Sequence, residues 1–416
     1  MQKLINTYNQ SKYYRYLILL ALSIPVINVI ATIAVGHITG GIINPGTLRA
    51  IIIYLMFIYI FNKGLPSNRL VLPTYLSIIA LFFSTLLSSD FTTSFYIYLR
   101  FVITSMLFVV GYYAVKTTHI LARLNRVIVF VLAIQLIYIV LANVFKFGTS
   151  DYLEGSFYFG ETGVNITKEM VIAVFIAPIF FILEKNKRVK IFAALLFIAS
   201  LVIILIGLKR AALLSVGAGV LIYFWFSPRK FKSIRIIVLG FLFMALLSPY
   251  FINIVQERYE ARSKKVSMSY EELDEDEGRV QEIEIVWQNF LEKNTFGKLL
   301  GSNPFLSKQD YFGINRIIHV DYLSLLDGGG IIGLLLYMWV YFAIFMHILM
   351  YSSAIKQTEF WGELKTVGIT LIVIQLIMGL AGTIIGIGLR GLSLMYLGAI
   401  CGVLHRQYLV QKAQNK

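Results

Sequence analysis

The chain has few charged residues and a single cysteine. Asp, Glu, Lys and Arg make up 14% of its 416 residues, whereas hydrophobic residues make up 58%. Soluble globular domains carry roughly 25% charged residues, so this composition predicts a multi-span membrane protein. Cys401 has no second cysteine to pair with, which excludes an intramolecular disulfide.

A cleavable signal peptide and an internal repeat are also missing from the sequence. The polar, basic segment Met1–Arg15 precedes a long apolar run without a small-residue cleavage site, so we expect an uncleaved first span. Without a half-to-half repeat, a transporter is disfavoured. The net charge of +15 comes mainly from short loops between apolar runs, where Lys and Arg orient helices. Nucleic acid is therefore not an expected partner.

Long apolar runs dominate the sequence. A helix needs about 20 apolar residues to cross the hydrocarbon core. The region from Lys190 to Phe226 is about twice that length, so we expect it to fold back near Gly207. The sequence thus predicts an all-α integral membrane protein with about twelve transmembrane helices, near residues 16–36, 47–62, 70–88, 95–115, 126–145, 169–183, 190–206, 210–226, 233–252, 330–350, 364–386 and 389–405.

The basic residues predict the orientation of these spans. With the N-terminus in the cytoplasm, 21 Lys and Arg residues fall on the cytoplasmic side, whereas five lie in the short outer connections. This asymmetry fits the positive-inside rule. We expect both termini in the cytoplasm and the segment between the ninth and tenth spans outside.

That segment, residues 253–318, is the one long charged part of the chain. It holds 12 of the 22 acidic residues and nine of the 37 basic ones. We expect three parts: spans one to nine in 1–252, a partly helical extracytoplasmic loop in 253–318, and spans ten to twelve in 319–416. Val280, Ile283, Trp287, Phe290 and Leu291 recur at helical spacing, which predicts an amphipathic helix lying over the membrane domain.

Three arginines fall at or just inside the expected outer ends of spans: Arg49, Arg100 and Arg390. Lys209 and Arg210 interrupt the longest apolar region on the same side. Arginine suits phosphate because its planar fork makes bidentate hydrogen bonds, so these side chains are candidates for an anion site. The alternative is that they extend to lipid phosphates at the membrane surface.

Three segments together resemble the O-antigen polymerase and ligase family of bacterial envelope glycosyltransferases. The segment from Gly207 to Leu214 is similar to the family's Ser-Arg-small-residue segment, with Lys209 where Ser or Thr is usual. Gly278-Arg279, followed by Trp287 and the glycines at 297 and 301, is similar to its Arg…Trp…Gly-x-Gly stretch. The run from His319 to Gly333 is similar to its His-Asn-x-Tyr/Phe-Leu…Gly-Ile-Ile-Gly segment, with Val320 in place of Asn.

The resemblance implies a donor glycan on polyprenyl pyrophosphate, a glycan acceptor, a site on the outer face of the bacterial cytoplasmic membrane, and no cofactor or metal. Other polysaccharide assembly proteins are further expected partners. Arg210 and Arg279 would stabilise the departing pyrophosphate, with Lys209, Arg100, Arg49 and Arg390 as weaker contributors. His319 would accept or orient the acceptor's proton.

Each of these residues also has a structural interpretation. His319 could cap a helix or sit hydrogen-bonded in an interface. Asp321 and Asp327 are weak supporting candidates that equally suit caps or hydrogen-bond partners. Gly328, Gly329 and Gly330 are costly inside a helix, so they predict a bend or close packing where the loop re-enters the membrane domain.

The leading functional interpretation is polymerisation of lipid-linked oligosaccharide repeats into a surface polysaccharide. The nearest alternative is a ligase that transfers the finished glycan to a lipid A core or another acceptor. The second alternative is a transporter of polysaccharide or lipid-linked sugar.

Overall fold

The structure, a computed structural model, is helical almost throughout the residues it describes. These are 68–88, 90–148, 157–160, 166–207, 209–228, 275–301, 306–307, 316–318, 320–356, 358–380 and 390–415, with part of 51–61 and residue 256. Its helices are α3 (Leu72–Leu86), α4 (Phe91–Ala114), α5 (Thr118–Phe145), α6 (Ile166–Leu183), α7 (Lys187–Ile206), α8 (Arg210–Phe226), α10 (Glu275–Glu292), α11 (Thr295–Leu300), α13 (Asp321–Ala354), α14 (Glu359–Met378) and α15 (Leu392–Gln414). Two short antiparallel strands, β1 (Leu306–Ser307) and β2 (Arg316–Ile317), lie between α11 and α13.

The predicted class of all-α membrane protein is confirmed. Within the described ranges, six helices are long and apolar enough to cross a membrane, namely Ser94–Ala114 of α4, α5, α6, α7, α13 and α14. The apolar helices Leu72–Leu86 and Ala211–Phe226 are shorter. The total of about twelve spans remains a prediction, because candidate spans 16–36 and 233–252 and much of 47–62 lie outside the described residues.

The predicted break near Gly207 is confirmed. Helix α7 ends at Ile206 with Gly207 as its C-cap, and α8 begins at Arg210. At the other end of α7, the Asn186 side chain accepts a hydrogen bond from the Arg188 backbone N–H. Capping of this kind satisfies a donor that the first turn leaves free, so local sequence defines the start of α7.

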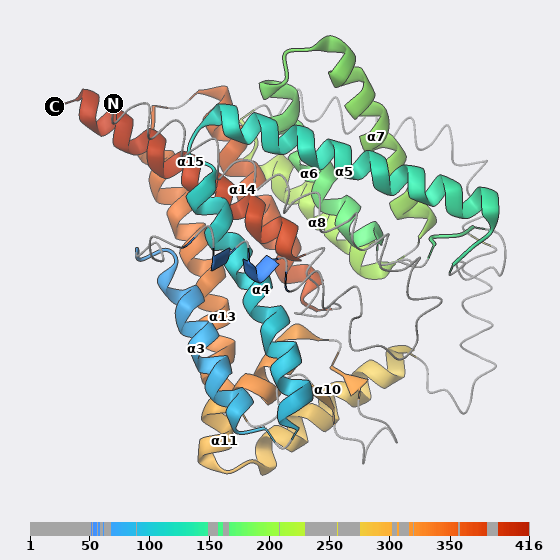
Figure 1. The fold of residues 1–416 in the computed structure, drawn as a ribbon, viewed down its shortest axis with the longest axis vertical. Coiled ribbons are helices and arrows are strands. Elements are labelled where there is room, and N and C mark those ends of the chain that lie inside the picture. The colour runs from blue at the N-terminus through green and yellow to red at the C-terminus, as the bar shows by residue number, and fades with distance from the viewer. Residues whose placement is uncertain are drawn as a thin grey trace.

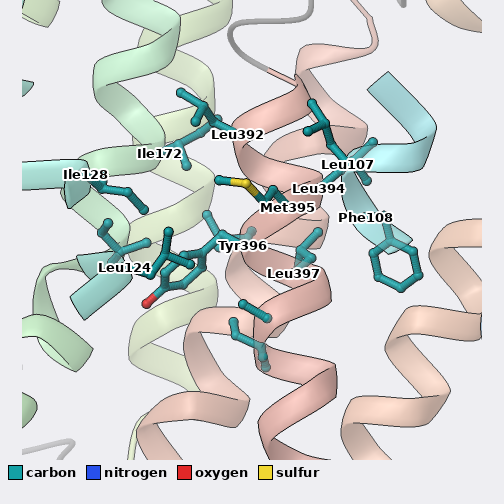
Figure 2. Close-up of a cluster of buried hydrophobic side chains, with 14 of the residues drawn as sticks. Leu107, Phe108, Leu124, Ile128, Ile172, Leu392, Leu394, Met395, Tyr396 and Leu397 are labelled. Carbon is teal, nitrogen blue, oxygen red and sulfur yellow. The ribbon is translucent and has the colours of Figure 1, made fainter. Parts of the chain in front are cut away.

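Helix α15 lies at the centre of the bundle. Figure 2 shows its residues Met395 and Tyr396 between Leu107 of α4, Leu124 of α5 and Ile172 of α6. Tyr396 is fully buried, and its hydroxyl donates a 2.8 Å hydrogen bond to Oδ1 of Asn125. The hydrophobic core is therefore built around α15.

Glycines let α15 approach α4 closely. A Cβ atom on Gly398 would lie 2.1 Å from the Phe108 carbonyl oxygen, and one on Gly402 would lie 2.5 Å from the Tyr112 carbonyl oxygen. Glycines four residues apart on one helix face are typical of tight helix pairs in membranes. The α4–α15 contact is accordingly the most extensive between any two of the described helices.

Candidate functional site

One end of the bundle gathers the start of α13, the end of α14 and the start of α15. The Asp321 backbone N–H donates a 2.9 Å hydrogen bond to the Gly379 carbonyl oxygen. The Tyr322 hydroxyl donates a 2.5 Å hydrogen bond to the Leu376 carbonyl oxygen. These two bonds fix the first turn of α13, which directly follows His319, against the last turn of α14.

A buried ion pair lies at this junction. The Arg390 guanidinium, one residue before Gly391 at the N-cap of α15, pairs with the Asp321 carboxylate. Its Nη1 also donates a 2.9 Å hydrogen bond to the Tyr337 hydroxyl. Arg390 is 1% exposed and Asp321 is 0% exposed. A pair so fully withdrawn from water carries a large desolvation cost, so each charge depends on the other.

This geometry decides between the alternatives for two predicted site residues. The interpretation that Arg390 extends to lipid phosphates is wrong, because its side chain is buried in the protein and held by Asp321 and Tyr337. The interpretation of Asp321 as a structural partner is confirmed by the same pair. Direct contact between Arg390 and a pyrophosphate remains a prediction.

Asp327 connects α13 to the charged segment. The Lys293 ammonium, just after α10, lies 2.5 Å from Oδ1 of Asp327 and 2.5 Å from its carbonyl oxygen. Both side chains are largely buried, with exposures of 14% for Lys293 and 8% for Asp327. The suggestion that Asp327 shares a face with His319 remains a prediction, because His319 lies outside the described residues.

The predicted bend at the three glycines is confirmed. Gly330 has φ 64° and ψ −170°, which interrupts α13. A Cβ on Gly330 would lie 2.4 Å from the Leu299 carbonyl carbon, and one on Gly301 would lie 2.0 Å from the Gly328 carbonyl oxygen. The Ser84 hydroxyl of α3 donates to the same Gly328 oxygen. The end of α11 therefore rests backbone-to-backbone on the bend in α13.

The predicted helix in the charged segment is confirmed as α10, but its predicted orientation is partly wrong. Val286 and Phe290 are buried, as expected for a face that lies on the rest of the protein. Ile283, Trp287 and Leu291 are instead 47%, 50% and 52% exposed. The apolar residues of the sequence pattern lie on one arc of the helix, and the buried face is rotated away from the middle of that arc, so that of its described members only Phe290 at its edge is buried.

Two of the three main catalytic candidates, Arg210 and Arg279, are placed by their backbones only. Arg210 begins α8, and Arg279 lies in the first half of α10. His319 directly precedes Val320, the N-cap of α13, and itself lies outside the described residues, as does Arg49. The roles of all four remain predictions.

Two weaker candidates have described side chains. Lys209 is the half-buried N-cap residue of α8. Arg100 lies within α4, where its guanidinium donates to the Tyr96 hydroxyl and its Cζ sits 4.3 Å from the centroid of the Tyr96 ring. Among the described residues, no hydrogen bond or ion pair joins Arg100 to the α13–α15 junction.

Helix α8 runs antiparallel to α14. Near the end of α8, the Tyr223 hydroxyl donates a 2.6 Å bond to Oε2 of Glu363, and the Thr366 hydroxyl donates a 2.9 Å bond to the Phe226 carbonyl oxygen. Glu363 and Thr366 lie early in α14, whose last turn contacts the start of α13. Helices α8 and α14 pack extensively. The start of α8, with Arg210, therefore lies toward the end of the bundle that contains the start of α13.

Several residues of this junction were not expected from the sequence. Lys293 and Tyr337 complete the two ion-paired contacts, and Tyr322 ties α13 to α14. Gln375 on α14 is fully buried, and its side-chain amide has no hydrogen-bond partner among the described residues. A signal for Lys293 existed, because it continues the helical spacing of Glu282, Val286 and Asn289. Tyr337 and Gln375 carry no signal beyond a polar group in an apolar run.

Metal ligation finds no ready site in the described part of the chain. No group of three or more His, Cys, Asp or Glu side chains there is arranged to hold a metal ion. The side chains of the acidic run at 271–277 fall outside that part.

These features define a multi-span helical membrane protein with a charged segment fastened to one end of its bundle. Residues 194–338 match the family model Wzy_C, described as O-antigen ligase. The match confirms the resemblance to the O-antigen polymerase and ligase family, and it covers α8, α10, α11 and the first half of α13. No curated protein matches the chain. The long apolar helices indicate a membrane protein, and residues 194–338 are similar to O-antigen ligases.

Proposed function

We propose that this protein polymerises polyprenyl-pyrophosphate-linked oligosaccharide repeats into a surface polysaccharide, without a metal, on the outer face of the cytoplasmic membrane. The observation that carries the proposal is the O-antigen ligase match at residues 194–338, which contains Arg210, Arg279 and His319. The structure supports it, because the start of α8 and the start of α13 lie toward the same end of the bundle.

The proposed reaction is a single displacement at the anomeric carbon of the donor glycan. An acceptor sugar hydroxyl forms the new C–O bond, its proton passes to His319, and the old C–O bond to pyrophosphate breaks. The bonding electrons leave with polyprenyl pyrophosphate. Arg210 and Arg279 stabilise the negative charge that develops there, because fixed guanidinium groups need no reorganisation during the step.

The remaining basic candidates divide into two groups in this proposal. Lys209, Arg100 and Arg49 add positive potential around the pyrophosphate. The Arg390 charge is already paired with Asp321, which follows His319 by two residues in the sequence. Arg390 therefore acts on His319 through Asp321. We therefore assign Arg390 and Asp321 a positioning role.

The proposed topology follows the distribution of basic residues. Twelve spans with both termini in the cytoplasm place the connection between α6 and α7, with Lys185, Lys187 and Arg188, on the inner side. The residues from 253 to 318 then face outward, where a lipid-linked donor is presented.

A ligase remains the second candidate, because the family model is described as O-antigen ligase. The same site would then transfer a finished glycan to a lipid A core or another acceptor. The two candidates differ in what accumulates when the protein is missing.

The test is a chain-length profile of surface polysaccharide in a deletion strain. The strain is complemented with wild type, Arg210→Ala, Arg279→Ala or His319→Ala, with Arg188→Ala, an exposed residue at the start of α7, as the matched control. Membrane expression of each variant is measured alongside. We expect long chains with wild type and the control, and single-repeat material with the other three.

Two results would contradict the proposal. Long chains that form without the protein but stay on their lipid carrier indicate a ligase. Repeats that never reach the outer face indicate transport.

A further inference from the structure

Helix α10 has three distinct faces. Successive residues turn by about 100° around a helix axis, which divides the described side chains of α10 into three groups. The buried face consists of Glu282, Val286, Asn289 and Phe290; the exposed apolar stripe consists of Ile283, Trp287 and Leu291; the exposed polar face consists of Glu284, Gln288 and Glu292. The apolar stripe therefore lies between the protein on one side and a polar face on the other.

The polarity of α10 only partly follows the pattern of a surface helix in water, because polar residues lie on its buried face and large apolar residues are exposed. Glu282 is 0% exposed and Asn289 is 4% exposed, whereas the three large side chains of the stripe are about half exposed. A surface helix in water turns its apolar residues inward. Side chains such as Trp287 and Leu291 gain little from this arrangement unless an apolar medium covers them.

The stripe continues onto other exposed apolar surface. Helix α11 follows α10 directly and exposes Phe296 and Leu299 by 57% and 41%. It packs against α3, whose last turns expose Phe83 and Leu86 by 53% and 50%. The exposed apolar residues of α3 suit contact with hydrocarbon, and the α11 residues extend that apolar surface toward α10.

The depth of α11 agrees with membrane contact. Helix α13 bends at Gly330, and the part from Ile331 to Ala354 is about 36 Å long at 1.5 Å per residue. That length spans the hydrocarbon core of about 30 Å, which puts Gly330 near the membrane surface. The backbone of Leu299 touches Gly330, so α11 lies at that level.

Figure 1 shows α10 and α11 at the lower ends of α3, α4 and α13, with α10 running across the direction of these helices. A helix that crosses the spans at the membrane surface can turn one face to acyl chains and another to water. The stripe and the polar face of α10 suit these two media.

We propose that the α10–α11 hairpin is seated in the membrane interface, with Ile283, Trp287 and Leu291 in contact with the acyl chains of the adjoining leaflet. The polar face of α10 contacts water, and the face with Glu282 and Asn289 contacts the protein. Within the charged segment, α10 and α11 are thus bound to lipid. This inference depends on the chain spanning a membrane and is independent of its reaction.

The test is spin-label accessibility in protein reconstituted into phosphatidylcholine–phosphatidylglycerol bilayers. Cys401, the chain's one cysteine, is buried and is replaced by Ala. Single cysteines are then introduced at Ile283 and Leu291, with Glu284 and Gln288 as matched positions on the polar face of the same helix. Collision rates are measured with oxygen, which concentrates in hydrocarbon, and with a water-soluble nickel chelate.

We expect labels at 283 and 291 to collide mainly with oxygen, and labels at 284 and 288 mainly with the nickel chelate. Nickel collisions at all four positions would overturn the proposal, because the helix would then stand in water. Low collision rates with both reagents at 283 and 291 would also overturn it, because a protein surface would then cover the stripe.

A second measurement avoids new cysteines. Trp287 emission, taken as the difference between wild type and Trp287→Phe, is compared in ordinary and brominated phosphatidylcholine. Bromine on the acyl chains quenches tryptophan on contact, so we expect the difference signal to fall at least twofold. An unchanged difference signal would contradict the proposal.

Discussion

Each end of the helix bundle holds an arginine–carboxylate pair, and the two pairs lie in different surroundings. Arg126 of α5 donates to Glu184, which lies between α6 and α7, through Nε at 2.6 Å and Nη2 at 3.0 Å, while the Arg126 side chain stays 58% exposed. At the start of α13, the Arg390 side chain is 2% exposed and that of Asp321 is 0% exposed. Arg126 therefore remains in contact with solvent, whereas Arg390 is shielded from it.

The two carboxylates also have different tasks. Glu184 accepts 2.9 Å hydrogen bonds from the backbone N–H groups of Lys185 and Asn186, so it orders the turn before α7. Asp321 instead joins α13 to the start of α15, at the junction next to His319. Both pairs join segments far apart in the sequence, but only Glu184 also orders a local turn through its backbone hydrogen bonds.

The largest effect is expected when the buried pair is broken. Asp321→Ala leaves the Arg390 charge buried without its partner, which costs roughly 3–5 kcal/mol of folding stability. The measurement is thermal unfolding of purified protein in detergent. The double variant Asp321→Leu with Arg390→Met removes both charges, so we expect it to recover most of the loss. If Asp321→Ala lowers the melting temperature no more than Glu184→Ala does, the buried pair does not stabilise the protein more than the exposed pair.

A somewhat smaller effect is expected at the bend of α13. Gly330→Ala forces a side chain into a backbone conformation that is almost restricted to glycine, which costs about 1–3 kcal/mol. The new Cβ also meets the Leu299 backbone. Protease sensitivity between α10 and α13 measures the loosened contact. Gly217→Ala in α8 is the control, because a Cβ there meets no atom within 4 Å. Equal sensitivity of the two variants would show that α11 does not depend on the bend.

A third change tests the ion pair between Lys293 and Asp327. Lys293→Met removes the cation from the largely buried Asp327 carboxylate, and we expect a loss of about 2 kcal/mol, within the range for weakening a buried charged contact. Hydrogen exchange of α10 and α11 amides reports whether the loss is local. Lys298→Met, a substitution of the same kind on α11, is the control. If amide protection in α10 and α11 is unchanged in Lys293→Met, this ion pair does not hold the two helices against α13.

The smallest effect is expected at the exposed pair. Hydrogen bonds from Arg126 hold the pKa of Glu184 below its usual value of 4.5. The stabilisation is therefore present above about pH 4.5 and is lost as the pH falls through the lowered pKa. Because Arg126 is largely exposed, we expect about 1 kcal/mol. Melting curves of wild type and Glu184→Gln should differ at pH 7 and converge in acid; a constant gap would contradict this.

The sequence predicted the features that depend on local composition. The break at Gly207, the helix at α10 and the bend at Gly328–Gly330 follow from apolar length, helical spacing and the cost of glycine, and the structure bears out each one. These properties need no knowledge of the rest of the chain.

The pairings could not be predicted in the same way. Asp321 and Arg390 are far apart in sequence, and no pattern in either segment predicts that they form an ion pair. The exposed stripe of α10 was missed because Ile283 and Phe290 fit one helical pattern equally well, although one is exposed and the other buried. Which face turns inward depends on the bend of α13, a tertiary feature.

The contact of Gly301 with Gly328 has a mechanical consequence. Backbone rests on backbone with no side chain between them, so there is no flexible layer to absorb relative movement. Helices α10 and α11 must therefore move together with α13 as one rigid unit. Any movement that opens the bundle beside this contact has to come from helices other than α11 and α13.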